Sequence, residues 1–279
     1  MRVGVLHPGE MGASVAASLL AGSHEVAWCS AGRSEHSHTR AVELREFSQL
    51  DDLVAWAEVL ISVCPPANAL QQAQAVQACA FDGLYVDANA IAPATALAIA
   101  KLMGAAYVDG GIIGPPAWQP GTTRMYLSGN NANVVAALFT DAVLDAIAIP
   151  QAEVDQAAAS ALKMAYAAYT KGHSALLLAA NALAHNSGVL DVLRSEWELS
   201  LPGLGQRSEI TAQAISAKAW RFVGEMQEIS ATFAGAGLPA EFHNGAAELY
   251  ARLSEFKDQP PASLDKLLDV LAQAEDTSG

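Results

Sequence analysis

The sequence predicts an N-terminal α/β domain with a doubly wound parallel sheet, followed by an all-helical domain. Three observations carry this prediction. Short apolar runs alternate with helical patterns over the first 150 residues, which is typical of βαβ units. A glycine-containing turn, residues 7–12, joins the first apolar run to a helix of small residues. After Pro150 the strand signals stop and an Ala- and Leu-rich helical pattern takes over. We therefore expect one domain over residues 1–150 and a second over 151–279.

Each strand of the first domain is expected where a short apolar run is bounded by Gly, Pro or charged residues. The predicted strands are Arg2–Leu6, Glu25–Cys29, Val59–Cys64, Leu84–Asp87, Ala106–Asp109 and Met125–Ser128. The predicted helices between and after them are Gly12–Ala21, Thr95–Met103 and Asn131–Asp145. Strands separated by helices pair in parallel, so this order predicts a parallel sheet covered by helices.

The second domain begins with a long helix, predicted over Gln151–Ala184, which has almost no polar stripe. Further helices are expected over Val189–Leu199, Glu209–Gly235, Ala240–Phe256 and Ser263–Glu275. A Gly-containing segment that ends at Pro239 separates the second of these from the third. The residues that follow the long helix are too few to cover its apolar surface, and an isologous dimer would cover it. We therefore expect a homodimer built through the helical domain.

The composition excludes several classes of protein. Hydrophobic residues make up 52% of the 279 residues and charged residues 16%, which is enough for a sizeable core and excludes intrinsic disorder. The net charge of −14 makes nucleic acid or an anionic membrane an unexpected partner. No apolar run is long enough to cross a bilayer, and the N-terminus lacks a signal-peptide pattern. Three cysteines and seven histidines without ligand spacing predict no metal site and a cytoplasmic location.

The turn after the first strand predicts a dinucleotide site. It reads as G-x-G-x-x-G with the first glycine replaced, and its residues are His7, Pro8, Gly9, Glu10, Met11 and Gly12. Such a turn brings backbone N–H groups close to a pyrophosphate at a helix N-terminus. After the second strand, Ser30, Arg33 and Ser34 stand where an acidic residue selects NAD. A guanidinium and two hydroxyls suit a 2′-phosphate, so NADP is expected over NAD.

Several segments occur in an order that resembles a known superfamily. They are residues 7–12, 61–68, 86–95, 109–114 and 121–129, followed by 161–172, 218–226 and 237–243. Together they resemble the β-hydroxyacid dehydrogenase and 6-phosphogluconate dehydrogenase superfamily. Within it, they resemble a branch of phosphogluconate-dehydrogenase-like proteins with a small helical C-terminal domain. The resemblance implies a Rossmann domain, a long interdomain helix, a dimerising helical domain and a small-molecule substrate. It also implies cofactor contacts from Cys64, Pro65, Pro66 and Asn89.

The resemblance implies that a Lys on the interdomain helix acts as general acid and base, and Lys163 holds that place. Its surroundings are apolar, which favours a lowered pKa for an ammonium group. Tyr166 and Thr170 share its helix face, and Glu225 and His243 are the candidates from the helical domain. A substrate loop is expected at Gly111, Ile112, Ile113 and Gly114.

This chain departs from the superfamily pattern around the expected substrate. The Asn that usually follows the Lys by four residues is Ala167, and the Ser of the glycine-rich loop is Ile113. The usual Lys-Asp pair on a later helix is Gly224 and Glu225. The leading expectation is an NADP-dependent oxidoreductase acting on a small hydroxyl or carbonyl compound. The alternatives are an imine-reductase-like NADPH enzyme and a non-catalytic NADP-sensing protein.

Overall fold

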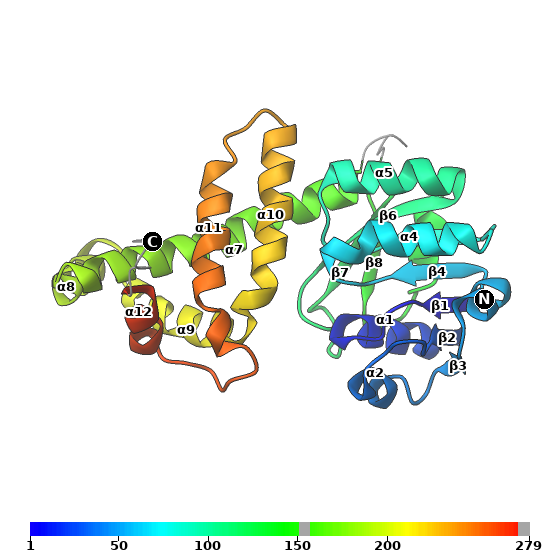
Figure 1. Cartoon of the computed structure of the whole chain (residues 1–279), viewed down its shortest axis with the longest axis horizontal. Helices are drawn as coiled ribbons and strands as arrows, with labels where there is room; N and C mark the ends of the chain where they lie inside the picture. The colour runs from blue at the N-terminus through cyan, green and yellow to red at the C-terminus, as the bar shows by residue number, and fades with distance from the viewer. Residues whose placement is uncertain (151–156, 273–279) are drawn as a thin grey trace, which may run out of the picture. The chain divides into compact units, whose positions relative to one another are not determined.

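The computed structural model describes residues 1–150 and 157–272 (Figure 1). It contains two compact units, Met1–Met164 and Ala165–Gly279, each described by itself below. The units meet within one helix, α7 (Ala158–Asn186), whereas the sequence prediction puts the domain boundary at Pro150. The first turns of α7 therefore belong to the first unit. Among the described residues, no helix is both long and apolar enough to span a membrane.

The first unit is built on one eight-stranded sheet with the order β3-β2-β1-β4-β5-β6-β7-β8. The strands are β1 (Arg2–Val5), β2 (Glu25–Cys29), β3 (Arg45–Phe47), β4 (Val59–Ser62), β5 (Leu84–Asp87), β6 (Tyr107–Ile113), β7 (Arg124–Ser128) and β8 (Asp145–Ala148). All neighbouring strands are parallel except β6 and β7, which are antiparallel. The strand order reverses at β1 and β4, and ligands of such sheets bind beyond the carboxyl ends of the strands at this point.

Helices cover both faces of the sheet, which confirms the doubly wound prediction. They are α1 (Glu10–Ala21), α2 (Glu35–Arg40), α3 (Leu50–Trp56), α4 (Ala69–Ala78), α5 (Pro93–Met103) and α6 (Ala132–Ala137), with 3₁₀ turns at Pro66–Asn68 and Gly104–Ala106. One core packs α1 and α6 against alternate strand residues such as Val3 and Val5. The other core packs α3, α4 and α5 against the opposite face, around Leu60 and Tyr85.

Two predicted elements of the first unit are wrong. The helix predicted over Asn131–Asp145 ends at Ala137, and Asp145 begins β8. Asp141 adopts a left-handed φ of 61°, which breaks the helical path. The substrate loop expected at residues 111–114 is mostly strand, because β6 continues to Ile113 by antiparallel pairing with β7. The short elements β3, α2, α3 and α4 were not among the sequence expectations.

The second unit is helical, as predicted. After α7 it contains α8 (Leu190–Ser200), α9 (Leu204–Ile215), α10 (Ala219–Gly235), α11 (Glu241–Arg252) and α12 (Leu264–Ala272), with 3₁₀ turns at Ser216–Lys218 and Ser254–Phe256. The single helix predicted over Glu209–Gly235 is two helices. Ser216 lies at the break, where its Oγ accepts the Ala262 N–H at 3.0 Å. Parts of the predicted helices Gln151–Ala184 and Ser263–Glu275 lie outside the described residues.

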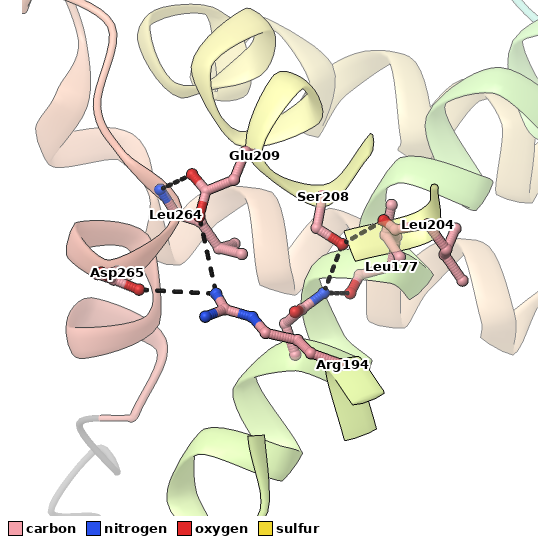
Figure 2. A network of polar contacts seen from close by, with 8 residues as sticks. Leu177, Arg194, Leu204, Ser208, Glu209, Leu264 and Asp265 are labelled. Carbon is pink, nitrogen blue, oxygen red and sulfur yellow. Dashed lines mark hydrogen bonds and ion pairs between the residues drawn. The ribbon is translucent and has the colours of Figure 1, made fainter. Parts of the chain in front are cut away.

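A polar network joins four helices of the second unit (Figure 2). Arg194 of α8 lies 3.7 Å from Glu209 of α9 and 3.8 Å from Asp265 of α12. Glu209 also accepts a backbone N–H at the start of α12, at 3.3 Å. Asn181 of α7 is fully buried and donates to Ser208 of α9 at 3.1 Å. These contacts set the packing of α8, α9 and α12 around the C-terminal half of α7.

Candidate active site

The turn between β1 and α1 places two glycines for different reasons. At Gly12, a Cβ would collide with the carbonyl oxygen of His7, so only glycine lets α1 begin here. At Gly9, the N-cap of α1, a Cβ would meet no atom within 4 Å, and the backbone angles suit any residue. The chain itself therefore does not require glycine at position 9. The open space lies against the N-terminus of α1, as a dinucleotide pyrophosphate requires.

The rest of this turn is held in place by its neighbours. Pro8 is buried and Met11 is half-buried. Glu10, in the first turn of α1, pairs with Arg40 at 3.9 Å. Ser14 Oγ donates to the Met11 carbonyl at 2.8 Å and accepts the Ala117 N–H at 2.9 Å. The loop after β6 is thus tied to α1, and this contact between distant segments was not predicted.

His7 and Arg33 approach each other from the turns after β1 and β2. His7 Nδ1 and Arg33 Nε are both buried without a hydrogen-bond partner in the described part of the chain. Burial, helped by the Arg33 charge, lowers the pKa of His7 to about 4, so its imidazole is neutral at physiological pH. Arg33 remains a cation, and no carboxylate of the described residues lies within ion-pair distance of it. Two unpaired polar atoms therefore stand ready for an anionic ligand.

The two serines predicted beside Arg33 already have partners within the chain. Ser34 is the N-cap of α2 and accepts the Ser37 N–H at 3.4 Å. Ser30 Oγ donates to the Phe47 carbonyl at 3.4 Å. Both bonds are long and could be exchanged for a ligand oxygen. Of the three residues predicted to hold a 2′-phosphate, Arg33 is the one with a buried polar atom, its Nε, that has no hydrogen-bond partner among the described residues.

The loops after β4 and β5 are joined through Asn89. Its Oδ1 accepts the Cys64 N–H at 2.5 Å, and its Nδ2 donates to Ser62 Oγ at 3.1 Å. Asn89 is 2% exposed, so its side chain shapes the loop that the sequence assigns to the cofactor. Burial raises the pKa of Cys64 to about 11, which keeps its thiol neutral. Pro65 is exposed, and Pro66 begins the 3₁₀ turn that leads to α4.

Lys163 lies at the carboxyl edge of the sheet, beside β6. A Cβ on Gly111 would lie 2.6 Å from the Ala159 carbonyl oxygen and 3.0 Å from Lys163 Cβ. Asp87, the last residue of β5, pairs with Asp109, so Gly111 lies beyond the end of β5. Lys163 therefore occupies the same edge as the turns after β1, β2, β4 and β5. Sequence reasoning predicted the residue, and the close packing on Gly111 explains its location.

The predicted substrate loop differs from expectation. Ile112 and Ile113 lie in β6 with side chains that are 6% and 5% exposed, so they are core residues of the sheet. Gly114 follows the strand with a left-handed φ of 128°. Of the four loop residues, Gly111 contacts the helix that carries Lys163 and Gly114 lies exposed where the loop begins.

The remaining candidates belong to the second unit. Glu225 forms an ion pair with Lys171 at 2.9 Å, with side chains 14% and 17% exposed, so this carboxylate is engaged within the unit. Thr170 Oγ1 donates to the Tyr166 carbonyl at 3.1 Å. His243 is buried and packs edge-on against two phenylalanine rings, and burial lowers its pKa. Among these candidates, Tyr166 presents a half-exposed ring.

A buried pair of acidic residues, Asp87 and Asp109, was not predicted from the sequence. Tyr85 and Asp87 of β5 pair in register with Tyr107 and Asp109 of β6. Burial raises the pKa of both carboxyl groups, that of Asp87 to about 7, and their mutual repulsion adds to the effect on Asp87. The repeated Tyr-Val-Asp tripeptide in the sequence was the available signal. A cavity of about 470 Å³ opens near Tyr107, at the amino end of β6 and so away from the carboxyl edge.

The comparisons agree with this architecture. The family DUF1932, a domain of unknown function, matches residues 184–253. An uncharacterized 28.5 kDa protein from Methanothermus fervidus is 31% identical over 198 residues, which are 69% of this chain and 74% of that protein. A solved structure of the conserved protein MTH1747, whose function is unknown, is described as structurally similar to 3-hydroxyacid dehydrogenases. It is 27% identical with a TM-score of 0.69, covering 92% of this chain and 98% of its own.

A Mycobacterium tuberculosis 3-hydroxyisobutyrate dehydrogenase, solved with L-serine, shares the fold at 16% identity. Its TM-score is 0.69, over 98% of this chain and 99% of its own. The chain therefore belongs to the same family as the Methanothermus fervidus protein, and it has the fold of the 3-hydroxyacid dehydrogenases. The match to DUF1932 lies in its helical unit.

Proposed function

We propose that this chain is an NADP-dependent oxidoreductase that acts on a small hydroxyl or carbonyl compound, with Lys163 as its acid and base. The supporting observation is that one sheet edge carries the open turn at Gly9, the unpaired Arg33 cation and Lys163. The residues present fit a nicotinamide dinucleotide, which would accept or supply the hydride. The turn holds the pyrophosphate, and Arg33 and His7 hold the adenosine end.

Arg33 makes the preference for NADP testable. Arg33→Ala removes the cation while leaving the turn after β1 intact. Loss of a charge-assisted contact weakens NADPH binding by about 1.5–3 kcal/mol, and NADH binding changes much less because NADH has no 2′-phosphate. Titration of cofactor fluorescence measures both affinities. Arg2→Ala is the matched control, since Arg2 begins β1 at the opposite edge and pairs with Glu58. Equal losses for both cofactors would refute the assignment.

Lys163 is proposed to give a proton to the substrate oxygen on reduction and to take it back on oxidation. The start of its side chain packs against Gly111 of β6, where a Cβ would lie 3.0 Å from Lys163 Cβ. Lys163→Met should lower turnover by about 10²-fold or more while NADPH binding stays near that of wild type. Lys101→Met is the control, because Lys101 is exposed at the end of α5. Turnover within a few-fold of wild type would contradict the role.

Assays of a panel of compounds can determine the substrate class. Ala167 and Ile113 stand where the superfamily pattern has a polar Asn and Ser, so the usual contacts with a small hydroxyacid are missing. Assays with 3-hydroxyacids and with cyclic imines, followed by absorbance of NADPH, distinguish a hydroxyl or carbonyl substrate from an imine. Tight NADPH binding without turnover on any compound would favour the non-catalytic NADP-sensing alternative.

The helical domain is proposed to form a homodimer. In the second unit, Tyr169, Leu176 and Leu183 recur every seven residues along α7 and are 73%, 55% and 70% exposed. Such a stripe on a helix is typical of a helix–helix interface. Light scattering should give about 58 kDa, twice the chain mass of 29.0 kDa. Leu183→Glu should shift the mass toward that of the monomer, and a monomeric wild type would refute the dimer.

A further inference from the structure

The start of α7 is held by a carboxylate from the middle of the sheet. Asp109 of β6 is 3% exposed. Its Oδ2 accepts the Ser160 N–H at 2.9 Å and the Ser128 hydroxyl at 3.0 Å, and its Oδ1 accepts the Ser160 hydroxyl at 2.5 Å. Ser128 Oγ in turn accepts the Ala159 N–H at 3.2 Å. Two N–H groups at the open end of the helix are thus satisfied by β6 and β7.

The same faces of β6 and α7 also meet at a second point, further along both elements. Asp109 and Gly111 are two residues apart on β6 and point to one face of the sheet. Ser160 and Lys163 are three residues apart on α7 and share one face of the helix. Asp109 bonds Ser160, and Gly111 lies against Lys163 Cβ. The hydrogen bonds between Asp109 and Ser160 therefore fix the position of α7 along β6 and its rotation about its own axis. Both determine where the Lys163 stem lies against Gly111.

From this geometry we infer that Asp109 is a positioning residue for Lys163, acting through the cap of α7. This inference rests on the proposed function of Lys163 as acid and base. Asp109 itself does not touch the reacting atoms, because its oxygens are occupied by Ser128 and Ser160. Removal of a cap that served only stability would lower the free energy of unfolding and have no other effect. Removal of a cap that positions Lys163 would also change the surroundings of the ammonium group in the folded protein.

Asp109→Asn is the direct test. The amide replaces one acceptor oxygen by an NH₂ donor, which opposes a hydroxyl or N–H donor of the cap. Displacement of a reacting group by about 1 Å lowers turnover on the order of 10- to 100-fold, so kcat should fall while the NADPH Kd changes less than about twofold. Asp145→Asn is the matched control, because Asp145 is exposed on β8. It should leave kcat unchanged.

A second readout does not need a substrate. The chain has six lysines, so reductive ¹³C-methylation gives few NMR signals, and loss of one signal in Lys163→Arg assigns Lys163. In folded Asp109→Asn, the chemical shift and titration midpoint of that signal should differ from wild type. In Asp145→Asn they should not. If the signal moves but wild type turns over no compound of the panel, the positioning role stands and the proposed function fails.

Two further variants keep the test decisive if Asp109→Asn does not fold. Ser160→Ala removes one donor and leaves Asp109 in place. Gly111→Ala would bring a methyl group 2.6 Å from the Ala159 carbonyl oxygen and 3.0 Å from Lys163 Cβ, so α7 must shift with no change of charge. Both should move the Lys163 signal and lower kcat by about tenfold or more. If every folded variant leaves the Lys163 signal and kcat as in wild type, Asp109 is a structural cap and the inference is wrong.

Discussion

Replacement of Asp87 by Asn should flatten the dependence of stability on pH. Asp87 ends β5, is fully buried, and accepts the Asn89 N–H at 3.0 Å. Burial raises its pKa from 3.8 to about 7, with repulsion from Asp109 as a further cause. Asn keeps an oxygen that can accept the same N–H but carries no proton that titrates in this range. The substitution therefore removes the titration while it keeps the shape and the bond.

The sign follows from proton binding. Between pH 3.8 and about 7 the folded chain holds a proton on Asp87 that the unfolded chain has released, so the free energy of unfolding falls as pH rises. With these two pKa values, the stabilisation from the Asp87 proton is complete below pH 3.8, partly lost at about pH 5.5 and almost gone at about pH 8. Between about pH 5.5 and pH 8 the wild type should lose about 2 kcal/mol of its free energy of unfolding through Asp87.

Urea unfolding of the full chain, followed by circular dichroism from about pH 5.5 to pH 8, measures this dependence. Wild type minus Asp87→Asn isolates the contribution of this carboxyl group. Asp82→Asn serves as the control, because Asp82 is exposed just before β5, and it should follow the wild-type curve. Parallel curves for wild type and Asp87→Asn would show that Asp87 is ionised throughout, and the argument from burial would then be refuted.

Further predictions concern the glycine turn and the second unit. Gly12→Ala should lower the free energy of unfolding by about 2 kcal/mol or more in urea titrations, because its methyl group collides with a backbone carbonyl. Gly9→Ala should leave that free energy within about 0.5 kcal/mol and weaken NADPH binding, and the reverse pattern would contradict the pyrophosphate site. Lys171→Met should lower the Tm, since it removes the ion pair that the mostly buried Glu225 carboxylate makes with Lys171. Adding Glu225→Leu should restore most of the Tm, and no recovery would contradict this explanation.

Local patterns were enough to predict much of the fold. β2 and β5 have the predicted bounds, and composition and periodicity predicted that the chain after residue 157 is helical, although one predicted helix is two. The errors occur where tertiary pairing overrides local pattern. β8 has only partly buried and exposed residues, so it lacks an apolar run, and its pairing with β7 makes it a strand. Antiparallel pairing with β7 likewise extends β6 to Ile113, although Gly110 and Gly111 do not predict a strand there.

The site shows a similar division between local pattern and tertiary structure. A motif predicts Gly9 and Gly12 because residue type and spacing can express what the turn requires, whereas Lys163 was predicted through the family resemblance. Roles that depend on which strands lie side by side leave no such trace. Asn89 was predicted as a cofactor ligand, but its amide is used to hold Cys64, and that follows only from the pairing of β4 with β5.

Asp109 also has a role that the sequence alone does not reveal. In the sequence it is one of two aspartates that end a Tyr-Val-Asp tripeptide, and nothing local distinguishes it from Asp87. The difference arises because β6 continues past Asp109 and turns back as β7, which brings the Ser128 hydroxyl to one carboxyl oxygen and the start of α7 to both. Asp87 lacks such donors on its second oxygen, which is buried without a partner in the described chain. Asp109 therefore accepts the donors at the start of α7, whereas one oxygen of Asp87 has no such donor and burial raises the pKa of Asp87 to about 7.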